Sequence, residues 1–311
     1  MGGIPVVVIR GMLEAGKTTF IKESIINKDF GDLGKILVLA QEEGIEEYAD
    51  ELKKCKTEVV SIENKEDWNE KNINDIVRKF KPHVIFIEVN ETWDFNTLPL
   101  PSYFDIQQVM TIIDGSTFNV YFNNMRQKFV DMLKATEIVI INRCKPTEET
   151  SSFKKSIKII NSACAVIALD DNGMQLKLES DLPFSLKEDI IKLSLTDFGD
   201  FYIDTFENKD RYNGRIVEFE CMATFARSLP PKSFVAGRMA MTCCADDIQL
   251  IGHLCAYKGD LHLKNKTWIK LKAAIHYMKF RGSEEEQIIL DALEITPIPD
   301  KNDEEALLRL V

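Results

Sequence analysis

The sequence of 311 residues contains no apolar run that approaches the roughly 18 to 20 residues needed to span a bilayer. Met1 is followed by neither a basic segment nor an apolar secretory core. We therefore expect a cytoplasmic protein that does not insert into a membrane.

The sequence also has no excess of basic residues. Its 39 Lys and Arg are opposed by 50 Asp and Glu, and the formal net charge is -11. Phosphate backbones are held mainly by clustered cations, so a nucleic acid is not an expected partner. The seven cysteines are odd in number and do not form a secreted disulfide framework. In a reducing compartment they are core residues, metal ligands or reactive thiols.

Runs rich in valine and isoleucine alternate with polar, helix-compatible stretches in the first half of the chain. Buried strands of a parallel sheet have this pattern. We predict strands at residues 4–9, 36–40, 84–89, 109–113, 137–142 and 164–169, and helices at residues 17–28, 44–54, 70–80, 116–135 and 150–161. The alternation predicts an α/β domain over residues 1–175, with a doubly wound and mostly parallel sheet.

A polar, turn-rich stretch at residues 172–188 predicts a linker or domain edge. Five β-like runs follow, near residues 215–224, 234–242, 248–257, 267–277 and 286–296. Short strands at this spacing are typical of a small barrel or sandwich. We predict a β domain over residues 186–300, and more specifically an OB-like barrel.

The stretch "GMLEAGKT", Gly11 to Thr18, matches G-x-x-x-x-G-K-[ST] between a predicted strand and a predicted helix. In such a loop, consecutive backbone N–H groups and the helix N-terminus attract phosphate oxygens, and the lysine reaches the terminal phosphates. The threonine hydroxyl is a ligand for Mg²⁺. The predicted nucleotide-binding residues here are Gly11, Glu14, Ala15, Gly16, Lys17, Thr18 and Thr19. The alternative is a glycine-rich turn that binds nothing.

The loop "GMLEAGKTTFI" resembles that of the CobW/UreG/HypB-type P-loop GTPases, and most closely that of the CobW branch. Members of that branch are tied to metal insertion and metal homeostasis. The resemblance implies a P-loop NTPase fold, a purine nucleotide, GTP or another nucleoside triphosphate with Mg²⁺, and a role in metal handling.

Further segments resemble the same family in the same order. "LAQEEG" places Glu42, and the Walker B strand "VIFIEVNETW" places Glu88, at the family's acidic positions. The resemblance implies that both are Mg²⁺ ligands and that they act with Lys17 in catalysis. "IVIINRCK" resembles the base-reading segment and implies that Asn142 and Arg143 contact the base. Taken alone, each carboxylate is also an ordinary strand-end residue.

Three departures from the family pattern are visible. Lys145 stands where the family has the aspartate that accepts hydrogen bonds from guanine, and a lysine offers donors and no acceptor. Glu91 stands where a glycine normally follows the Walker B strand. The family's Cys-x-Cys-Cys cluster is missing from the matching region, "EVVSIENKEDW". Base selectivity and the source of metal ligands are therefore open.

A second candidate site lies in the C-terminal half. Cys243, Cys244, His253 and Cys255 fall within 13 residues and offer ligands suited to Zn²⁺. Adjacent cysteines on a strand point to opposite faces, whereas His253 and Cys255 share one. The alternative is that these are buried core residues, because free cysteine is commonly buried.

The segments "LPPKSFVAGR" and "RMAMTCCADD" resemble the C-terminal domain of the YcgQ-type bacterial proteins, a family associated with membrane permeases. That resemblance implies a partner-binding role for the second domain. Three functions stay open: a GTPase that serves a metalloprotein client, a nucleotide-binding adaptor of a membrane permease with little or no hydrolysis, and an ATPase or small-molecule kinase. The oligomeric state is also open.

Overall fold

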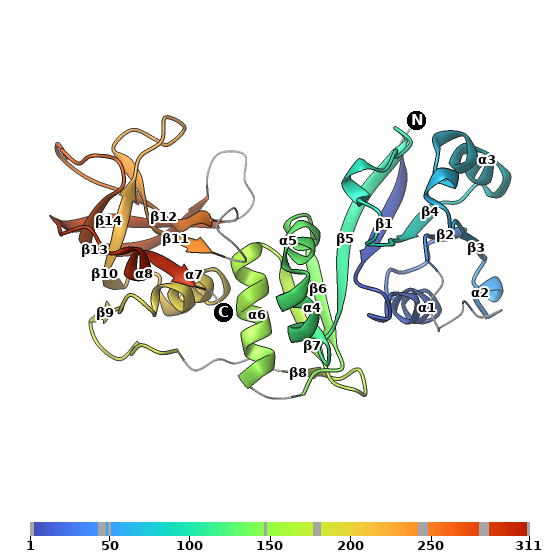
Figure 1. Cartoon of the computed structure of the whole chain (residues 1–311), viewed down its shortest axis with the longest axis horizontal. Coiled ribbons are helices and arrows are strands. Elements are labelled where there is room, and N and C mark those ends of the chain that lie inside the picture. Colours follow the sequence, from blue (N-terminus) through green and yellow to red (C-terminus); the bar gives the residue numbers. More distant parts are fainter. Residues whose placement is uncertain are drawn as a thin grey trace. The chain divides into compact units, whose positions relative to one another are not determined.

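The computed structural model of the chain describes residues 3–42, 48, 51–145, 148–176, 182–241, 248–279 and 286–309. The chain divides into two compact units, of which the first comprises Met1–Lys154 and Ala163–Leu178. The second comprises Lys155–Ser162 and Glu179–Val311. Figure 1 labels the elements of both units along the chain.

The first unit is built on an eight-stranded sheet with the order β3-β2-β4-β1-β5-β6-β7-β8. All neighbouring strands are parallel except β7 and β8. The strands are β1 (Ile4–Arg10), β2 (Ile36–Ala40), β3 (Thr57–Ser61), β4 (Val84–Glu88), β5 (Phe104–Asp114), β6 (Ile138–Asn142), β7 (Ala165–Leu169) and β8 (Gln175–Leu176). The predicted α/β fold with a mostly parallel sheet is confirmed.

Helices cover both faces of this sheet, because successive side chains of each strand point to opposite sides. On one face Val6 and Val8 of β1 belong to the same buried cluster as Ile73 of α3. On the other face Ile9 is buried with Ile21 of α1. The helices of this unit are α1 (Lys17–Asn27), α2 (Glu51–Lys54), α3 (Glu70–Phe80), α4 (Phe118–Asn124), α5 (Arg126–Lys134) and α6 (Glu148–Ile160), the last of which contributes residues to both units.

The structure differs from the sequence prediction at several elements of this unit. The short strand β8 was not predicted. Of the predicted helix at 44–54, the last turn is α2, and residues 44–47 and 49–50 lie outside the described residues. Strand β3 was not predicted, because it is a short, half-exposed edge strand without an apolar run. Strand β5 begins at Phe104 rather than near residue 109, since its first half pairs with β1 through mostly exposed side chains. The predicted helix at 116–135 divides into α4 and α5 at Met125, whose ψ of 35° is not helical.

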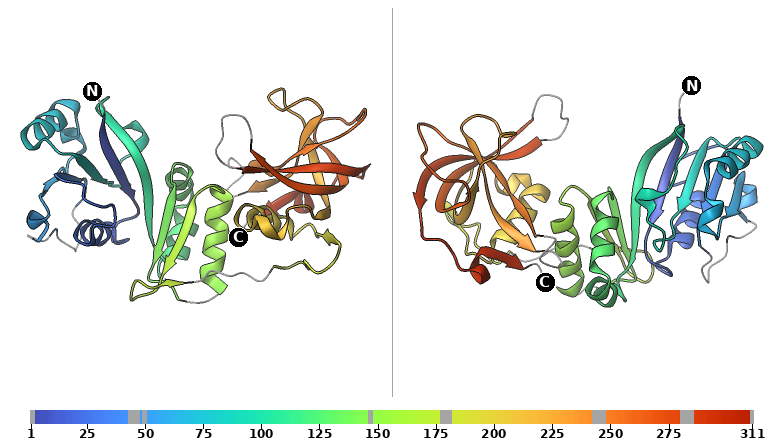
Figure 2. Two further views of the ribbon diagram at one scale, coloured as in Figure 1. Left: turned by 180° about the vertical axis from the view of Figure 1, so that it is seen from behind. Right: turned by 45° about the horizontal axis from the view of Figure 1, so that its top comes forward.

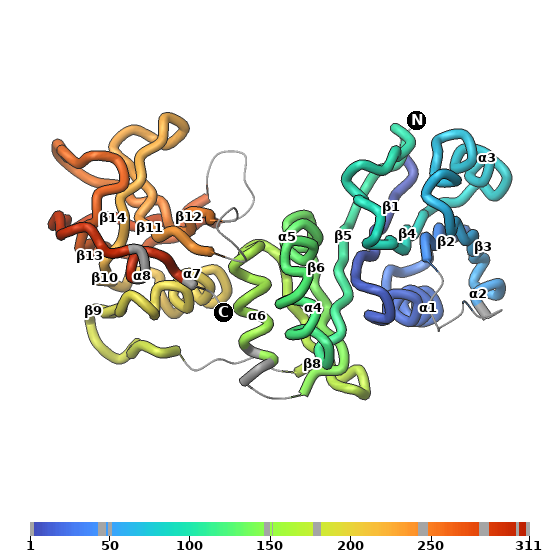
Figure 3. Tube along the Cα trace, in the orientation of Figure 1, coloured from blue at the N-terminus to red at the C-terminus, as the bar shows by residue number. Residues whose placement is uncertain are grey.

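The second unit contains a closed five-stranded barrel, in which β10, β11, β12, β14 and β13 are hydrogen-bonded in that cyclic order (Figure 3). Of the pairings that close the barrel, only that of β12 with β14 is parallel. The strands are β10 (Ile216–Thr224), β11 (Ser233–Met241), β12 (Ile248–Ala256), β13 (Thr267–Lys279) and β14 (Glu286–Pro297). The small C-terminal β domain is therefore confirmed, and the OB-like assignment stays a prediction.

The barrel core consists of inward-pointing residues of every barrel strand together with helix α7 (Phe198–Glu207). Phe198 and Phe201 of α7 pack on Phe219 of β10, with ring centroids 5.5 Å and 5.9 Å apart. Strands β9 (Ile190–Lys192) and β15 (Leu307–Arg309) extend the sheet, and helix α8 (Asp303–Ala306) precedes β15. Figure 2 shows the barrel strands, in orange and red, from two further sides.

Candidate functional site

The predicted phosphate loop connects the carboxyl end of β1 to the start of α1. Gly11 and Gly16 have φ values of 144° and 97°, which only glycine adopts without strain. A Cβ atom at Gly11 would lie 2.3 Å from the carbonyl oxygen of Ile112, and one at Gly16 would lie 2.7 Å from Nδ2 of Asn142. Both glycines are therefore required by the loop conformation and by close neighbours.

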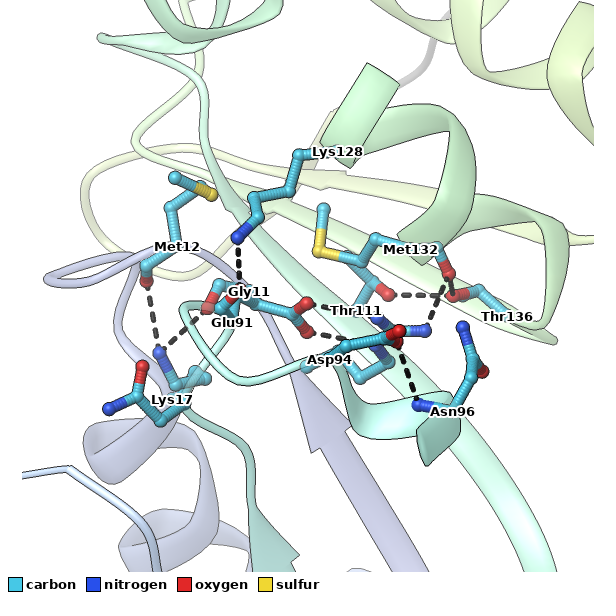
Figure 4. Close-up of polar contacts among 12 residues, drawn as sticks. Gly11, Met12, Lys17, Glu91, Asp94, Asn96, Thr111, Lys128, Met132 and Thr136 are labelled. Carbon is cyan, nitrogen blue, oxygen red and sulfur yellow. Dashed lines mark hydrogen bonds and ion pairs between the residues drawn. The ribbon is translucent and has the colours of Figure 1, made fainter. Parts of the chain in front are cut away.

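The Lys17 side chain is buried and folds back over the loop. Its Nζ donates hydrogen bonds to the carbonyl oxygens of Gly11 at 2.8 Å and Met12 at 3.0 Å, as Figure 4 shows. It also forms an ion pair with Glu42, which follows β2. Burial raises the pKa of the Glu42 carboxyl, and the charge of Lys17 opposes this rise. A cation held in this way at the loop is suited to an anionic ligand.

Thr18 and Glu88 lie together at the carboxyl ends of β1 and β4, two central strands of the sheet. Oγ1 of Thr18 donates to Oε1 of Glu88 at 2.7 Å, and the hydroxyl of Tyr48 donates to Oε2 at 2.5 Å. Burial, followed by the nearby Glu88 carboxylate, raises the pKa of Tyr48 well above its ordinary value. The structure thus brings together Thr18 and Glu88, which are 70 residues apart in the sequence, and adds Tyr48.

The residues at this point fit Mg²⁺. Mg²⁺ is a hard cation that prefers oxygen ligands and retains several waters. The hydroxyl of Thr18 and the carboxylate of Glu88 are such ligands, and Glu42 supplies a second carboxylate beside Lys17.

Asn142 and Arg143 lie against the outer side of the loop. Nδ2 of Asn142 donates to the carbonyl oxygen of Ala15 at 2.8 Å, and its buried Oδ1 has no partner among the described residues. Arg143 donates to the carbonyl oxygen of Glu14 at 3.2 Å and forms an ion pair with Asp114. The base-reading segment predicted from the sequence therefore contacts the loop directly.

The remaining predicted loop residues differ in their exposure. Glu14 is exposed and has a φ of 61°, so its side chain does not occupy the interior of the loop. Ala15 is buried, and Thr19 is half-buried on α1. Lys145 is exposed, and its carbonyl oxygen accepts a hydrogen bond from Thr150.

The loop adjoins a buried ion pair, which the sequence did not predict. Nε and Nη2 of Arg10 donate to Oε1 and Oε2 of Glu91 at 2.8 Å and 2.9 Å, and the two side chains are 4% and 5% exposed. Nζ of Lys128, from α5, donates to the carbonyl oxygen of Glu91 (Figure 4). The sequence signalled only that Glu91 replaces a glycine. Its partner could not be identified, because Arg10 is 81 residues away.

A cleft of about 380 Å³ lies beside this pair and the loop. Its lining includes Met12 and Leu13 of the loop and Glu42 beyond β2. Glu91 and Lys128 form another part of its wall. The cleft therefore begins at the loop end where the Lys17 ammonium is held.

The predicted zinc site is only partly within the described residues. Cys243 and Cys244 lie outside them, and no group of three or more His, Cys, Asp or Glu suited to a metal ion occurs in the described part of the chain. His253 and Cys255 point to the same face of β12, as expected, and that face is the barrel core. Burial raises the pKa of the Cys255 thiol, which disfavours the thiolate that binds zinc.

The imidazole of His253 occupies an aromatic pocket. Its Nε2 lies 3.1 Å from Oγ1 of Thr205, and its ring stacks on Tyr202 with centroids 5.1 Å apart. Burial lowers its pKa to about 3. The core alternative thus describes both residues better than the zinc interpretation does.

His253 makes the barrel sensitive to acid. The unfolded chain takes up a proton below about pH 6.5, whereas the folded state does not until about pH 3. Stability is therefore present above pH 6.5 and is lost as the pH falls toward 3, by about 1.4 kcal/mol per pH unit. We expect the wild-type protein and His253→Gln to differ in their pH dependence of unfolding by about 3 kcal/mol between pH 7 and pH 4.5. Parallel denaturation profiles for the two proteins would contradict this.

These features define the class of P-loop nucleotide-binding domains. They are a strand, a glycine-bounded loop and a helix in sequence, with a Thr–carboxylate pair at the carboxyl ends of the strands. Within this class, the chain belongs to the family described as CobW/HypB/UreG, nucleotide-binding domain, which matches residues 5–168. Residues 169–304 match the DUF1980 C-terminal domain. The family resemblance seen in the sequence is confirmed.

Several solved structures are similar to the chain. The hydrogenase maturation factor HypB from Archaeoglobus fulgidus is 18% identical, over 56% of this chain and 84% of its own, with a TM-score of 0.40. The Zn(II)-bound YjiA GTPase from E. coli is 15% identical, over 71% and 73%, with a TM-score of 0.40. HypB from Helicobacter pylori in complex with nickel is 14% identical, over 67% and 89%, with a TM-score of 0.39. No curated protein sequence matches the chain.

Among the described residues, no helix has the length and the apolar character that crossing a membrane requires.

Proposed function

We propose that residues 1–175 bind a purine nucleoside triphosphate, GTP in the first place, and hydrolyse its β–γ phosphoanhydride bond in the service of metal handling or metal insertion. The observation that carries the proposal is the position of Lys17, whose ammonium is held over the loop by the carbonyls of Gly11 and Met12. Membership of the CobW/HypB/UreG family supports the link to metals.

In this proposal the backbone N–H groups from Gly11 to Thr19 hold the phosphates, and the Lys17 ammonium neutralises the terminal one. Thr18, Glu42 and Glu88 would hold Mg²⁺, which would supply further positive charge to the phosphates. Phosphoryl transfer depends mainly on positioning and charge stabilisation, and these residues would provide both.

Lys145 is expected to make the preference for guanine over adenine weak. A carboxylate that accepts two hydrogen bonds from guanine is absent at this position, and hydrogen bonds to charged groups contribute about 1.5 to 3 kcal/mol each. We expect GTP to bind, with a preference over ATP of no more than about tenfold, measured by isothermal titration with GTP, GDP and ATP in Mg²⁺. If ATP binds and GTP does not, the ATPase alternative replaces the GTPase.

One observation favours the second candidate function, a nucleotide-binding adaptor with little hydrolysis. P-loop switches work through loops that move when the γ-phosphate is lost. Here the loop after β4 is tied by the buried Glu91 carboxylate to Arg10. Release of inorganic phosphate from bound triphosphate distinguishes the two functions, because an adaptor retains the triphosphate intact.

We assign partner binding to the barrel at residues 186–300, which we take as an OB-like domain of a cytoplasmic protein. Its acidic balance of charges does not favour a nucleic acid. A metalloprotein client and a membrane permease are the two partner classes in question. We do not extend the proposal to zinc at Cys255, since this residue and His253 are buried in the barrel core.

A further inference from the structure

The cleft beside the phosphate loop contains a lysine to which the proposed function gives no role. Lys128 lies on α5, and its partly buried side chain lines the cleft together with Met12 and Glu42. Its ammonium donates to the backbone carbonyl oxygen of Glu91. Within the described ranges of the chain, no carboxylate forms an ion pair with it.

Two of the three carboxylates that line the cleft are already neutralised, and the third, Glu63, is exposed to solvent. Both oxygens of Glu91 are occupied by Arg10 at 2.8 Å and 2.9 Å, and Glu42 is paired with Lys17. Lys128 is therefore a cation beside two completed ion pairs. An ammonium has three donors, and the Glu91 carbonyl takes one of them. A partly desolvated cation in this position favours an anionic ligand in the cleft.

The position of the cleft identifies the anion. Phosphates bound at the start of α1 extend toward the Lys17 ammonium, which is held at the carbonyls of Gly11 and Met12. Met12 is also part of the cleft wall, so the cleft continues from the place where the terminal phosphate would lie. Lys128 lines the cleft itself, and Lys17 is hydrogen-bonded to Met12 of the cleft wall (Figure 4).

We propose that Lys128 binds the terminal phosphate of the nucleoside triphosphate from the side of the cleft opposite Lys17, and that it distinguishes a triphosphate from a diphosphate. The inference rests on the proposed nucleotide site. The buried Arg10–Glu91 pair holds the residue whose carbonyl orients the Lys128 ammonium, so Glu91 positions this lysine without contacting the phosphate itself.

The test measures binding and not turnover. Lys128→Met retains the aliphatic stem and removes the charge, Lys128→Arg retains the charge, and Lys134→Met removes an exposed lysine of the same helix as a matched control. Affinities for GDP and for a non-hydrolysable β,γ-imido GTP analogue are measured in Mg²⁺ by isothermal titration. Unfolding without nucleotide is followed in parallel.

We expect Lys128→Met to weaken binding of the triphosphate analogue by about tenfold to 100-fold, as for the loss of one hydrogen bond to a charged group. Affinity for GDP should change less than about twofold, and Lys128→Arg should restore most of the difference. Lys134→Met should bind both nucleotides like the wild type.

Equal weakening of both nucleotides, or an unchanged triphosphate affinity, overturns the role of Lys128 and leaves the nucleotide site intact. If Lys128→Met does not fold, a Lys128→Gln variant provides the same ratio, with Lys128→Arg as its charge-retaining control. A wild-type protein that binds neither nucleotide removes the proposed function itself, and with it the ligand of Lys128.

Discussion

Lys17→Ala is expected to lower the affinity for a Mg²⁺-bound nucleoside triphosphate by about 100-fold or more. The ammonium contributes charge-assisted hydrogen bonds to the terminal phosphates, at about 1.5 to 3 kcal/mol each, and each 1.4 kcal/mol is a factor of ten. Isothermal titration of the variant against the wild type measures the loss.

Lys22→Ala is the control, because it removes the same charge from the next turn of α1. It should retain nearly full affinity. A Lys17→Ala protein that is folded and binds the triphosphate as tightly as the wild type would show that the loop has been misinterpreted.

Breaking the Arg10–Glu91 pair is expected to cost about 3 to 5 kcal/mol of folding free energy, because the remaining charge is left buried without its partner. The two side chains are only 4% and 5% exposed, so solvent does not screen the charge that remains after either substitution. We expect this effect for Arg10→Met and for Glu91→Leu, measured by urea denaturation.

The double variant Arg10→Met with Glu91→Leu should recover most of the stability, since a buried ion pair replaced by apolar side chains of similar size is often neutral. Single variants that each lose less than about 1 kcal/mol would contradict the buried pair. Such a result would also mean that the pair does not fix the Glu91 carbonyl to which Lys128 donates.

The parallel sheet could be predicted from the sequence because its central strands are continuous apolar runs. Strand β4, Val84–Glu88, is buried at every position, and so is β2. Strand β3 has exposed and half-exposed residues at the sheet edge, and it leaves no comparable pattern. Apolar runs therefore predict buried strands and miss strands that are hydrogen-bonded to a neighbour without being buried.

The phosphate loop could be predicted because its residues are contiguous and its glycines are required by φ angles and close contacts. The meeting of Thr18 with Glu88 was anticipated only through the family resemblance, since 70 residues separate them. Arg10 and Lys128 carry no local signal. Their importance arises from Glu91, which the fold places between them.

The cysteine-rich segment illustrates the opposite limit. Spacing on β12 correctly placed His253 and Cys255 on one face, but it could not say whether that face meets a metal or the core. Helix α7 supplies the answer, because its aromatic side chains and Thr205 enclose the imidazole. Cys243 and Cys244 lie outside the described residues, and their role stays a prediction.

The central claim is that the loop from Gly11 to Thr18 binds a triphosphate with Mg²⁺ held by Thr18 and Glu88. Titration of the wild-type protein with the non-hydrolysable GTP analogue and its ATP counterpart, in excess Mg²⁺ and again in chelator, tests it most directly. The account predicts saturable binding of one triphosphate per chain that weakens by about tenfold or more when Mg²⁺ is removed. No binding of either analogue in Mg²⁺ would contradict it.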